Sequence, residues 1–276
     1  MDIVAPPHSP LELLRRIGTA TSPLVIDVRR DEAFRGAPDL IAGATWRDPF
    51  AVDEWAKYLP RHRTVVAYCV HGHEISRNAA GALRSAGIDA RFLEGGIEAW
   101  REGGGTLLRK HGEAGIPSKP GAPSVWVTRE RPKIDRIACP WLVRRFVDPF
   151  AEFAYVPAPE VAAFAKARGA IPYDVPGVTF THRGELCSFD ALLEDFGLAG
   201  AALSRLAAIV RGADTGKPEL TPQSPGLLAI SLGLSENFAD DHAMLEHGMV
   251  VYDALFAWCR QEEAGVAERH TWRAPS

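Results

Sequence analysis

The chain has 276 residues, 31 Lys and Arg against 35 Asp and Glu, a formal net charge of −4 and an apolar content of 46%. These values are ordinary for a globular protein. We expect no membrane partner, because no apolar run is long enough to span a bilayer and the beginning shows no signal-peptide pattern. Four widely spaced cysteines without a CxxC motif argue against a disulfide framework and favour a reducing, cytoplasmic location.

The length favours two domains, because it exceeds the common size of a single one. A stretch rich in Gly, Pro and polar residues begins at the glycine run 103–105 and continues to residue 123, as linkers do. The two parts show no internal repeat. We expect a first domain over residues 1–108, a linker over 109–123, a second domain over 124–263 and a tail over 264–276.

In the first part, the β-branched run from Thr64 to Tyr68 predicts a strand that ends at Cys69. A small-residue helix is expected from Arg77 to Ala86. The first amides of a helix are unpaired and carry the positive end of its dipole, so they bind anions. A cysteine held there becomes a nucleophile. The alternative is that Cys69 is one more small, buried apolar residue.

The surrounding motifs resemble a single rhodanese domain, the sulfurtransferase module, over roughly residues 10 to 108. The resemblance implies an α/β domain with a central parallel sheet flanked by helices. It also implies that Cys69 takes up a sulfane sulfur as a persulfide without any cofactor. The motifs are Val25 to Arg29 with Glu32 and Phe34, Ile41 to Ala44, the Cys69 loop with Ala80, Leu83 and Gly87, and Leu93 to Trp100. The implied hydrogen-bond donors are the loop amides of Val70, His71, Gly72, His73, Glu74 and Ile75.

The loop departs from the usual rhodanese pattern in length and charge. It spans seven residues from Cys69 to Ile75, the length associated with dual-specificity phosphatases and arsenate reductases. Those enzymes close the loop with an Arg that binds a tetrahedral oxyanion, whereas this chain has Ile75. Glu74 adds a negative charge that weakens binding of a dianion. His71 and His73 could donate hydrogen bonds or titrate near neutrality, or they could be ordinary exposed residues.

The second part predicts a mostly α-helical α+β domain. Helical periodicity appears at 137–147, 160–168, 189–196, 202–210 and 240–259, and strand character at 125–127, 153–156 and 178–180. Pro140 is expected in the first turn of its helix, where the missing N–H costs nothing. Ser188 is expected to cap the N-terminus of the next segment.

This part resembles the C-terminal domain of chromate-resistance proteins of the ChrB type, over roughly residues 124 to 262. That family is linked to chromate tolerance and to control of a chromate exporter. The motifs that carry the resemblance are Ile134 to Cys139, Trp141 to Phe146, Thr181 to Gly184, Val210 to Asp214 and Asp240 to His242.

Two groups of side chains in the second part are candidate sites. Lys133, Arg136 and Arg144 could line an oxyanion site, or they could belong to a solvated helix face with local pairing of Asp135 and Arg136. The other group could bind a metal ion, since carboxylates and imidazoles suit iron, manganese or zinc. Its members are His182, Asp214, Asp241, His242 and Glu246, with His242 and Glu246 one helical turn apart. Alternatively, Asp240 to His242 only stabilise a helix start.

We therefore predict a rhodanese-like sulfurtransferase with Cys69 as nucleophile, coupled to a chromate-resistance-like domain that acts in chromate or metal stress. Its partners would be a sulfane-sulfur donor such as thiosulfate or a persulfide, a thiol acceptor, and chromate or a metal. One alternative is a non-catalytic sensor or regulator of chromate resistance. Another is an arsenate or chromate reductase, or a phosphatase-like loop. No nucleic-acid partner is expected, because the second part is acidic overall.

Overall fold

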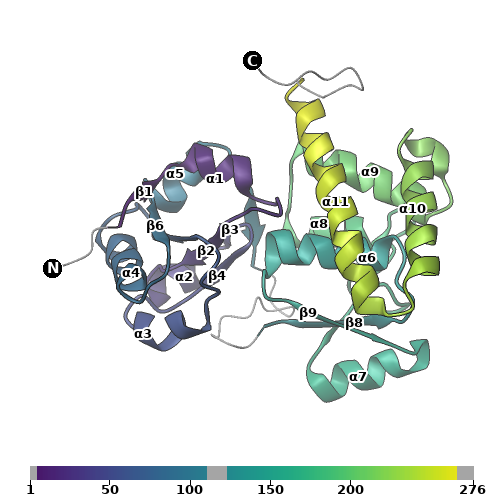
Figure 1. The fold of residues 1–276 in the computed structure, drawn as a ribbon, viewed down its shortest axis with the longest axis horizontal. Coiled ribbons are helices and arrows are strands. Elements are labelled where there is room, and N and C mark those ends of the chain that lie inside the picture. The colour runs from purple at the N-terminus through teal and green to yellow at the C-terminus, as the bar shows by residue number, and fades with distance from the viewer. Residues whose placement is uncertain (1–4, 111–122, 266–276) are drawn as a thin grey trace.

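The computed structural model describes residues 5–110 and 123–265, which form two lobes side by side (Figure 1). Residues 111–122 of the expected linker and 266–276 of the expected tail lie outside this part. The first lobe contains a five-stranded, all-parallel sheet in the order β1-β6-β5-β2-β4. Its elements are β1 (Pro7–His8), α1 (Pro10–Arg16), β2 (Leu24–Asp27), α2 (Asp31–Gly36), β3 (Asp39–Ile41), β4 (Ala44–Trp46), α3 (Val52–Trp55), η1 (Ala56–Tyr58), β5 (Val65–Tyr68), α4 (Glu74–Ser85), β6 (Ala90–Leu93), α5 (Gly96–Glu102) and β7 (Leu107–Arg109).

Helices cover both faces of this sheet, which confirms the predicted rhodanese-like architecture. Successive residues of a strand point to opposite faces. Leu24 and Ile26 therefore pack with α3 and α4, whereas Val25 packs with α1 and α5 on the other face. Strand β7 pairs with β3 in a separate antiparallel ribbon, so the chain remains attached to the first lobe as far as Arg109.

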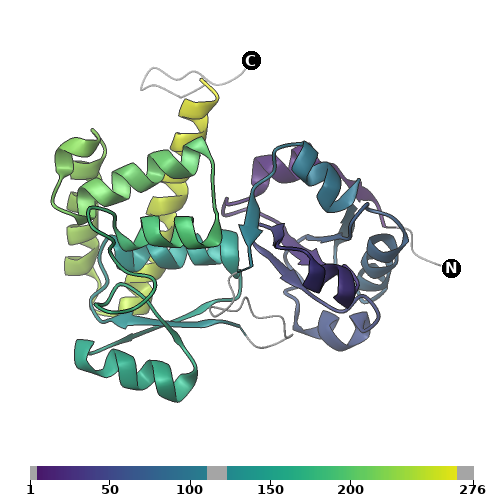
Figure 2. The same cartoon turned by 180° about the vertical axis from the view of Figure 1, so that it is seen from behind.

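The second lobe is mostly helical, as predicted, around a three-stranded parallel sheet in the order β10-β8-β9. The strand predicted at 178–180 is wrong, because only Phe180 forms an isolated bridge, to Tyr173, and the third strand lies at Ile171–Pro172. Helix α7 covers one face of the sheet and the other helices lie on the opposite side (Figure 2). Within the described residues, no helix is both long and apolar enough to cross a bilayer. The elements are β8 (Val125–Arg129), α6 (Asp135–Leu142), the π-helical turn η2 (Val143–Val147), β9 (Glu152–Val156), η3 (Ala158–Glu160), α7 (Val161–Arg168), β10 (Ile171–Pro172), α8 (Ser188–Phe196), α9 (Ala201–Asp214), η4 (Pro218–Leu220), α10 (Ser224–Asn237) and α11 (Asp241–Glu263).

The expectation for Pro140 is wrong, because helix α6 begins at Asp135 and Pro140 lies inside it. A proline in this position leaves the carbonyl four residues earlier without its helical donor. That carbonyl belongs to Arg136, and the hydroxyls of Tyr155 and Tyr173 donate to it at 3.4 and 3.3 Å. Two tyrosines from the sheet region thus replace the missing bond and tie α6 to the sheet.

The two lobes share one apolar core. The Gly43 amide donates to the Phe146 carbonyl at 2.6 Å, and the Phe146 ring fills the space beside Gly18. At Gly18, where φ is +76°, a Cβ atom would lie 2.2 Å from that ring. On α11, Arg260 donates to the Ile17 carbonyl at 3.5 Å. Both a close backbone approach and buried aromatic packing therefore hold the lobes together.

Candidate functional site

The predicted nucleophile, Cys69, directly follows β5, which lies in the centre of the five-stranded sheet. Ligands of α/β proteins bind beyond the carboxyl ends of parallel strands, where connecting loops converge. The residue is 7% exposed, and the loop after it leads into the twelve-residue helix α4 at Glu74. The structure therefore places the thiol between a buried strand and a helix N-terminus, although the helix begins at Glu74 rather than at the expected Arg77.

The main-chain amides around this loop are the outstanding feature of the site. Within the described residues, no acceptor takes a hydrogen bond from the amides of residues 70–76. Unpaired amides at a helix start carry partial positive charge and attract anions. The loop that begins at Cys69 can therefore surround a negatively charged sulfur atom with N–H donors.

Two glycines allow the loop to sit against the start of α5. Both have left-handed backbone angles, φ +67° at Gly72 and +61° at Gly96. A Cβ at Gly96 would lie 2.4 Å from the carbonyl oxygens of both Cys69 and Val70. Those same carbonyls accept hydrogen bonds from the amides of residues 97 and 98, at 3.0 and 3.2 Å. Helix α5 thus fixes the beginning of the cysteine loop through its backbone.

Ser76 is a neighbour of the thiol that sequence analysis missed. Its hydroxyl oxygen lies 3.3 Å from the sulfur of Cys69 and donates to the His73 carbonyl at 3.2 Å. A hydroxyl can accept from a thiol and, after rotation, donate to a thiolate. Its position in the sequence could have identified it, because Ser76 directly follows the predicted loop. In the structure it lies on the first turn of α4 and is fully buried.

The other predicted loop residues differ in exposure. His71, His73 and Glu74 are exposed, and the two imidazole rings lie 5.8 Å apart. Ile75 is half-buried and packs against the core beneath α4. Residues 70–76 include no Lys or Arg, so the positive potential in this loop comes from backbone amides. Catalytic roles for the imidazoles stay a prediction.

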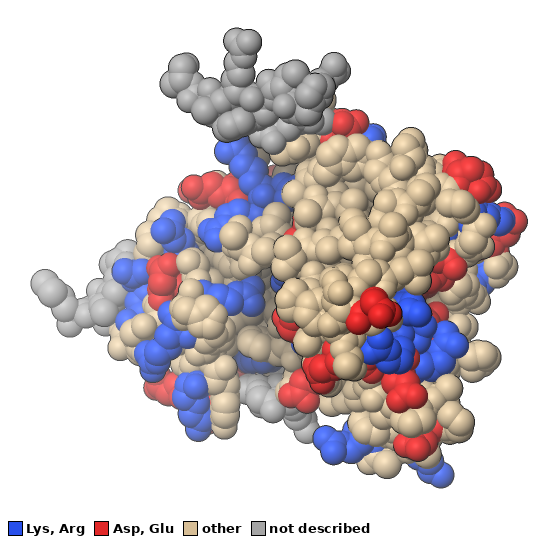
Figure 3. Space-filling view, turned by 45° about the vertical axis from the view of Figure 1, so that its right-hand side comes forward, with Lys and Arg blue, Asp and Glu red and all other residues tan. Residues whose placement is uncertain are grey.

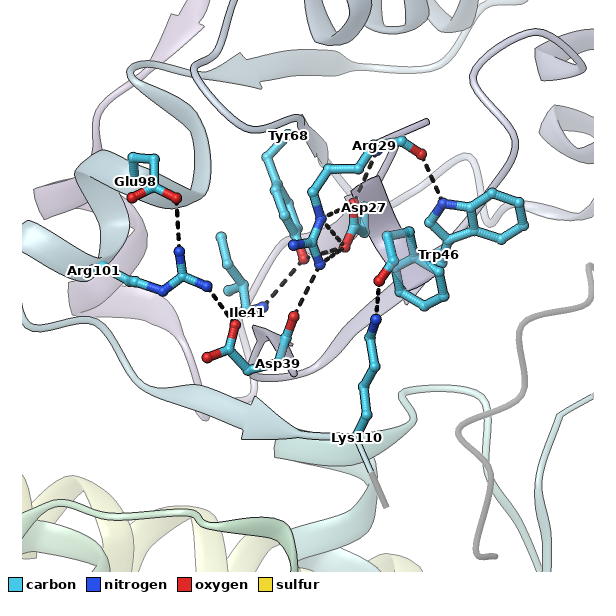
Figure 4. A network of polar contacts seen from close by, with 10 residues as sticks. Asp27, Arg29, Asp39, Ile41, Trp46, Tyr68, Glu98, Arg101 and Lys110 are labelled. Atoms are coloured by element: carbon cyan, nitrogen blue, oxygen red, sulfur yellow. Dashed lines mark hydrogen bonds and ion pairs between the residues drawn. The ribbon is translucent and has the colours of Figure 1, made fainter. Parts of the chain in front are cut away.

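A buried ionic network supports the strand that carries the thiol (Figure 4). The Tyr68 hydroxyl donates to Asp27 at 2.8 Å and accepts from the Ile41 amide at 3.1 Å. The Arg29 guanidinium binds both oxygens of Asp27 at 2.5–3.0 Å and donates to the Asp39 carbonyl at 3.0 Å. Burial opposes the charge on Arg29, but the hydrogen bond and the charge of Asp27 raise the pKa of the guanidinium. Burial and the Asp27 charge also raise the pKa of Tyr68. The network therefore clamps the carboxyl ends of β2 and β5 together beside Cys69.

The predicted oxyanion group of the second domain is divided between ion pairs. Arg136 contacts Asp174, with Nε 3.3 Å from a carboxylate oxygen. Arg144 contacts Glu246 at 2.7 Å. Lys133 precedes α6, and its carbonyl accepts from the Arg136 amide at 3.0 Å. An anion would have to compete with carboxylates for both guanidinium groups, and oxyanion binding stays a prediction.

The predicted metal group is likewise divided. His182 and Asp214 come together, with His182 Nε2 3.1 Å from an Asp214 oxygen. The other three predicted members make different contacts. The Arg131 amide donates to Asp241 at 3.1 Å, the ring of His242 lies edge-on to Tyr155 at 5.5 Å, and Glu246 pairs with Arg144.

Two aspartates that sequence analysis did not assign to this group, Asp135 and Asp174, complete the surroundings of His182. Its Nε2 lies 3.6 and 3.5 Å from their carboxylate oxygens. Asp135 belongs to the motif Ile134 to Cys139, but the sequence suggests for it only a local ion pair with Arg136. No periodicity or spacing pointed to Asp174.

Comparisons with known proteins agree with this two-part organisation. Residues 9–103 match the rhodanese-like domain family and residues 126–259 match the ChrB C-terminal domain family. Protein ChrB of Cupriavidus metallidurans is 36% identical over 132 residues, which are 48% of this chain and 39% of that protein. The chain thus spans well under half the length of this curated relative.

Two solved structures that resemble the chain each cover about a third of it. A rhodanese-related protein from Thermoplasma volcanium is 26% identical with a TM-score of 0.33, over 37% of this chain and 96% of that one. A rhodanese-like domain protein from Staphylococcus aureus is 24% identical with a TM-score of 0.31, over 34% of this chain and 90% of that one.

Proposed function

The chain joins a rhodanese-like domain to a ChrB C-terminal domain, and we propose that the first domain is a sulfurtransferase with Cys69 as nucleophile. The observation that carries this proposal is the cysteine loop itself. A thiol at the end of a central strand is followed by a run of amides, residues 70–76, that bond to no described acceptor. A persulfide is an anion, and such amides stabilise it where it forms.

The proposed reaction has two steps. The thiolate of Cys69 attacks the outer sulfur of thiosulfate, so that a new S–S bond forms and sulfite leaves with the electron pair of the old one. A thiolate or cyanide acceptor then attacks the outer sulfur of the persulfide, which restores the Cys69 thiolate. Ser76 takes part by donating its hydroxyl hydrogen to the thiolate, whose sulfur is 3.3 Å away. Charge-assisted bonds of this kind are stronger than neutral ones.

Phosphoryl transfer and oxyanion reduction fit the loop less well. Phosphatase-type loops need a guanidinium fork to bind the equatorial oxygens of a tetrahedral anion. Here Ile75 occupies the corresponding position and packs into the core. The loop contains no Lys or Arg between residues 70 and 76. A single sulfur anion needs fewer donors than a phosphate or arsenate, and the amides can supply them.

We further propose that this chemistry serves a response to chromate or another metal stress, as the ChrB-type second domain implies. The shared core between the lobes supports coupling, because a change in one lobe can reach the other through Phe146. Duplex DNA is the less favoured partner. On the face in Figure 3, blue and red side chains of the described residues are interspersed, whereas DNA binding uses a continuous basic surface.

The test uses the full chain, incubated with thiosulfate and digested for mass spectrometry. We expect one added sulfur on the peptide that carries Cys69, its removal by cyanide, and repeated thiocyanate release. Cys69→Ser should abolish both signals, while Cys259→Ser, at a buried cysteine on α11, should leave them intact. Persulfide formation without repeated thiocyanate release would instead favour the alternative function, a non-catalytic sensor or regulator. No adduct with thiosulfate or a small persulfide donor would refute the sulfurtransferase proposal.

A further inference from the structure

A cluster of four metal-ligating side chains lies in the second domain, apart from the cysteine loop. Asp135 begins α6, Asp214 ends α9, and Asp174 and His182 lie on the segment between β10 and α8. The nitrogen Nε2 of His182 lies 3.6, 3.5 and 3.1 Å from carboxylate oxygens of Asp135, Asp174 and Asp214. Donor atoms of Asp135, His182 and Asp214 all lie within 4.8 Å of one another.

The cluster concentrates negative charge where water is scarce. Asp135 is 0% exposed and Asp174 is also buried. Burial, followed by the charges of the neighbouring aspartates, raises the pKa of Asp135, and burial and Asp174 raise that of Asp214. Within the cluster, Arg136 and Arg129 form ion pairs with Asp174 alone, at 3.3 and 3.4 Å. Buried charges need a paired countercharge or a coordinated metal.

One oxygen of the cluster has no hydrogen-bond partner. Oδ1 of Asp135 is fully buried and has no described partner in hydrogen-bond geometry; the Cys187 thiol, a weak donor, lies beside this carboxylate. Its sister oxygen Oδ2 accepts from the Ser188 amide at 2.5 Å. A buried acceptor left unpaired costs about 1–3 kcal/mol. The unpaired oxygen belongs to Asp135, whose side chain is fully buried, so this site has an unused acceptor as well as an excess of negative charge.

We propose that Asp135, His182 and Asp214 bind one divalent transition-metal cation, with the Asp174 carboxylate beside them. Neighbouring donors about 2.1 Å from a metal ion are about 3.0–3.4 Å apart in octahedral or tetrahedral geometry. The 3.1 Å distance from His182 to Asp214 lies in this range, and the 3.6 Å distance to Asp135 is slightly longer. Carboxylate oxygens with one imidazole suit Mn²⁺ or Fe²⁺. His182 is 41% exposed and provides the path by which the ion enters.

The residues around the cluster hold the carboxylates in place. The Ser188 hydroxyl donates to Oδ1 of Asp174 at 2.8 Å, while its amide holds Asp135. The prediction that Ser188 caps the N-terminus of α8 is wrong, because Cys187 occupies the N-cap position. Ser188, the first residue of the helix, uses both its polar groups on the cluster. Outer partners of this kind orient the ligands of metal sites.

The competing explanation is an ion pair without metal, in which a protonated His182 neutralises part of the charge. The ion-pair explanation and the metal-site proposal differ in what they predict for added metal ions. An ion pair needs no ion from solution, and replacing His182 by a neutral side chain would only strengthen repulsion among the aspartates. A metal site instead takes up one ion per chain and loses affinity when any ligand is removed.

The experiment strips the full chain with a chelator and titrates it with Mn²⁺, followed by calorimetry and electron paramagnetic resonance. We expect one ion per chain and a ¹⁴N coupling from the imidazole. His182→Gln should remove the ¹⁴N coupling. Both His182→Gln and Asp214→Asn should weaken Mn²⁺ binding by at least about 100-fold. Glu246→Gln is the matched control and should leave metal affinity unchanged. Glu246 is an exposed carboxylate on α11 that pairs with Arg144, and it belongs to the metal-binding group predicted from the sequence.

Circular dichroism and the melting temperature establish that each variant is folded. Unchanged affinity in folded His182→Gln and Asp214→Asn would overturn the proposal. So would an equal loss in Glu246→Gln, or failure of the wild-type chain to bind Mn²⁺, Fe²⁺ or Zn²⁺ at millimolar concentration. The result is independent of sulfur transfer, because no member of the cluster belongs to the cysteine loop.

Discussion

The contact between Gly96 and the cysteine loop gives a quantitative prediction. Replacing Gly96 by Ala places a Cβ 2.4 Å from two backbone oxygens and 2.6 Å from the Gly72 nitrogen. Backbone cannot rotate away as a side chain does, so the loop must separate from α5 and lose the two hydrogen bonds that join them. These contribute about 1 kcal/mol each. The left-handed φ of +61° adds about 1–2 kcal/mol for any residue with a Cβ.

Gly104 is the matched control, because its φ is +72° and nothing lies within 4 Å of a Cβ built there. Gly104→Ala should therefore lower the free energy of unfolding only by the cost of a left-handed φ, about 1–2 kcal/mol. Gly96→Ala should lower it by about 2 kcal/mol more, because it also breaks two hydrogen bonds. Hydrogen exchange of α4 and α5 peptides measures both losses within the first domain. Displacement of the loop should also slow persulfide formation about 100-fold in Gly96→Ala and leave Gly104→Ala unaffected. Equal destabilisation and equal rates in the two variants would refute the reasoning.

Three further predictions concern the same domain. Ser76→Ala removes the hydroxyl beside the thiolate and should slow persulfide formation by about 10- to 100-fold, since a bond to a charged group contributes about 1.5–3 kcal/mol; an unchanged initial rate with thiosulfate would exclude this role. Tyr68→Phe leaves the buried Ile41 amide without its acceptor and should lower the free energy of unfolding by about 1–3 kcal/mol, as urea unfolding would show; Tyr58→Phe, on an exposed side chain, should have no effect. Burial lowers the pKa of His8 below 6.5, against the opposing charge of Glu12. The unfolded chain then binds the proton more readily, so stability should fall as the pH drops through 6.5; His8→Gln should flatten this slope in urea unfolding between pH 8 and 5, and an identical slope would contradict the assignment.

The cysteine site was predictable because it is continuous in sequence. A buried strand, a short loop and a helix start follow one another, and local chemistry decides where the thiol and the amides lie. The partners from other segments were not predictable. Gly96 could be recognised as part of a motif, but only the fold shows its Cα against the Cys69 carbonyl.

Helix α10 shows how tertiary contacts can override a hydrophobic pattern. Its buried positions include Ser224, Ser231 and Ser235, whereas Ile230 and Leu232 are exposed. Apolar periodicity therefore predicts no face for it. The serines are buried because their hydroxyls meet backbone groups of neighbouring segments: Ser231 accepts from the Ile134 amide at 3.0 Å, and Ser224 donates to the Ile209 carbonyl at 3.0 Å.

The sequence by itself determined the two-part organisation, the fold classes and the position of Cys69, because these depend on local patterns of burial and on motifs within short segments. Only the tertiary structure decided which charged residues of the second domain meet. Asp135, Asp174, His182 and Asp214 come from a helix start, a connecting segment and a helix end, and no period links them. Asp241, His242 and Glu246 share one helix with each other, yet α11 places them against Arg131, Tyr155 and Arg144. Sequence spacing reports neighbours on one element, whereas a cluster built from several elements depends on how those elements pack.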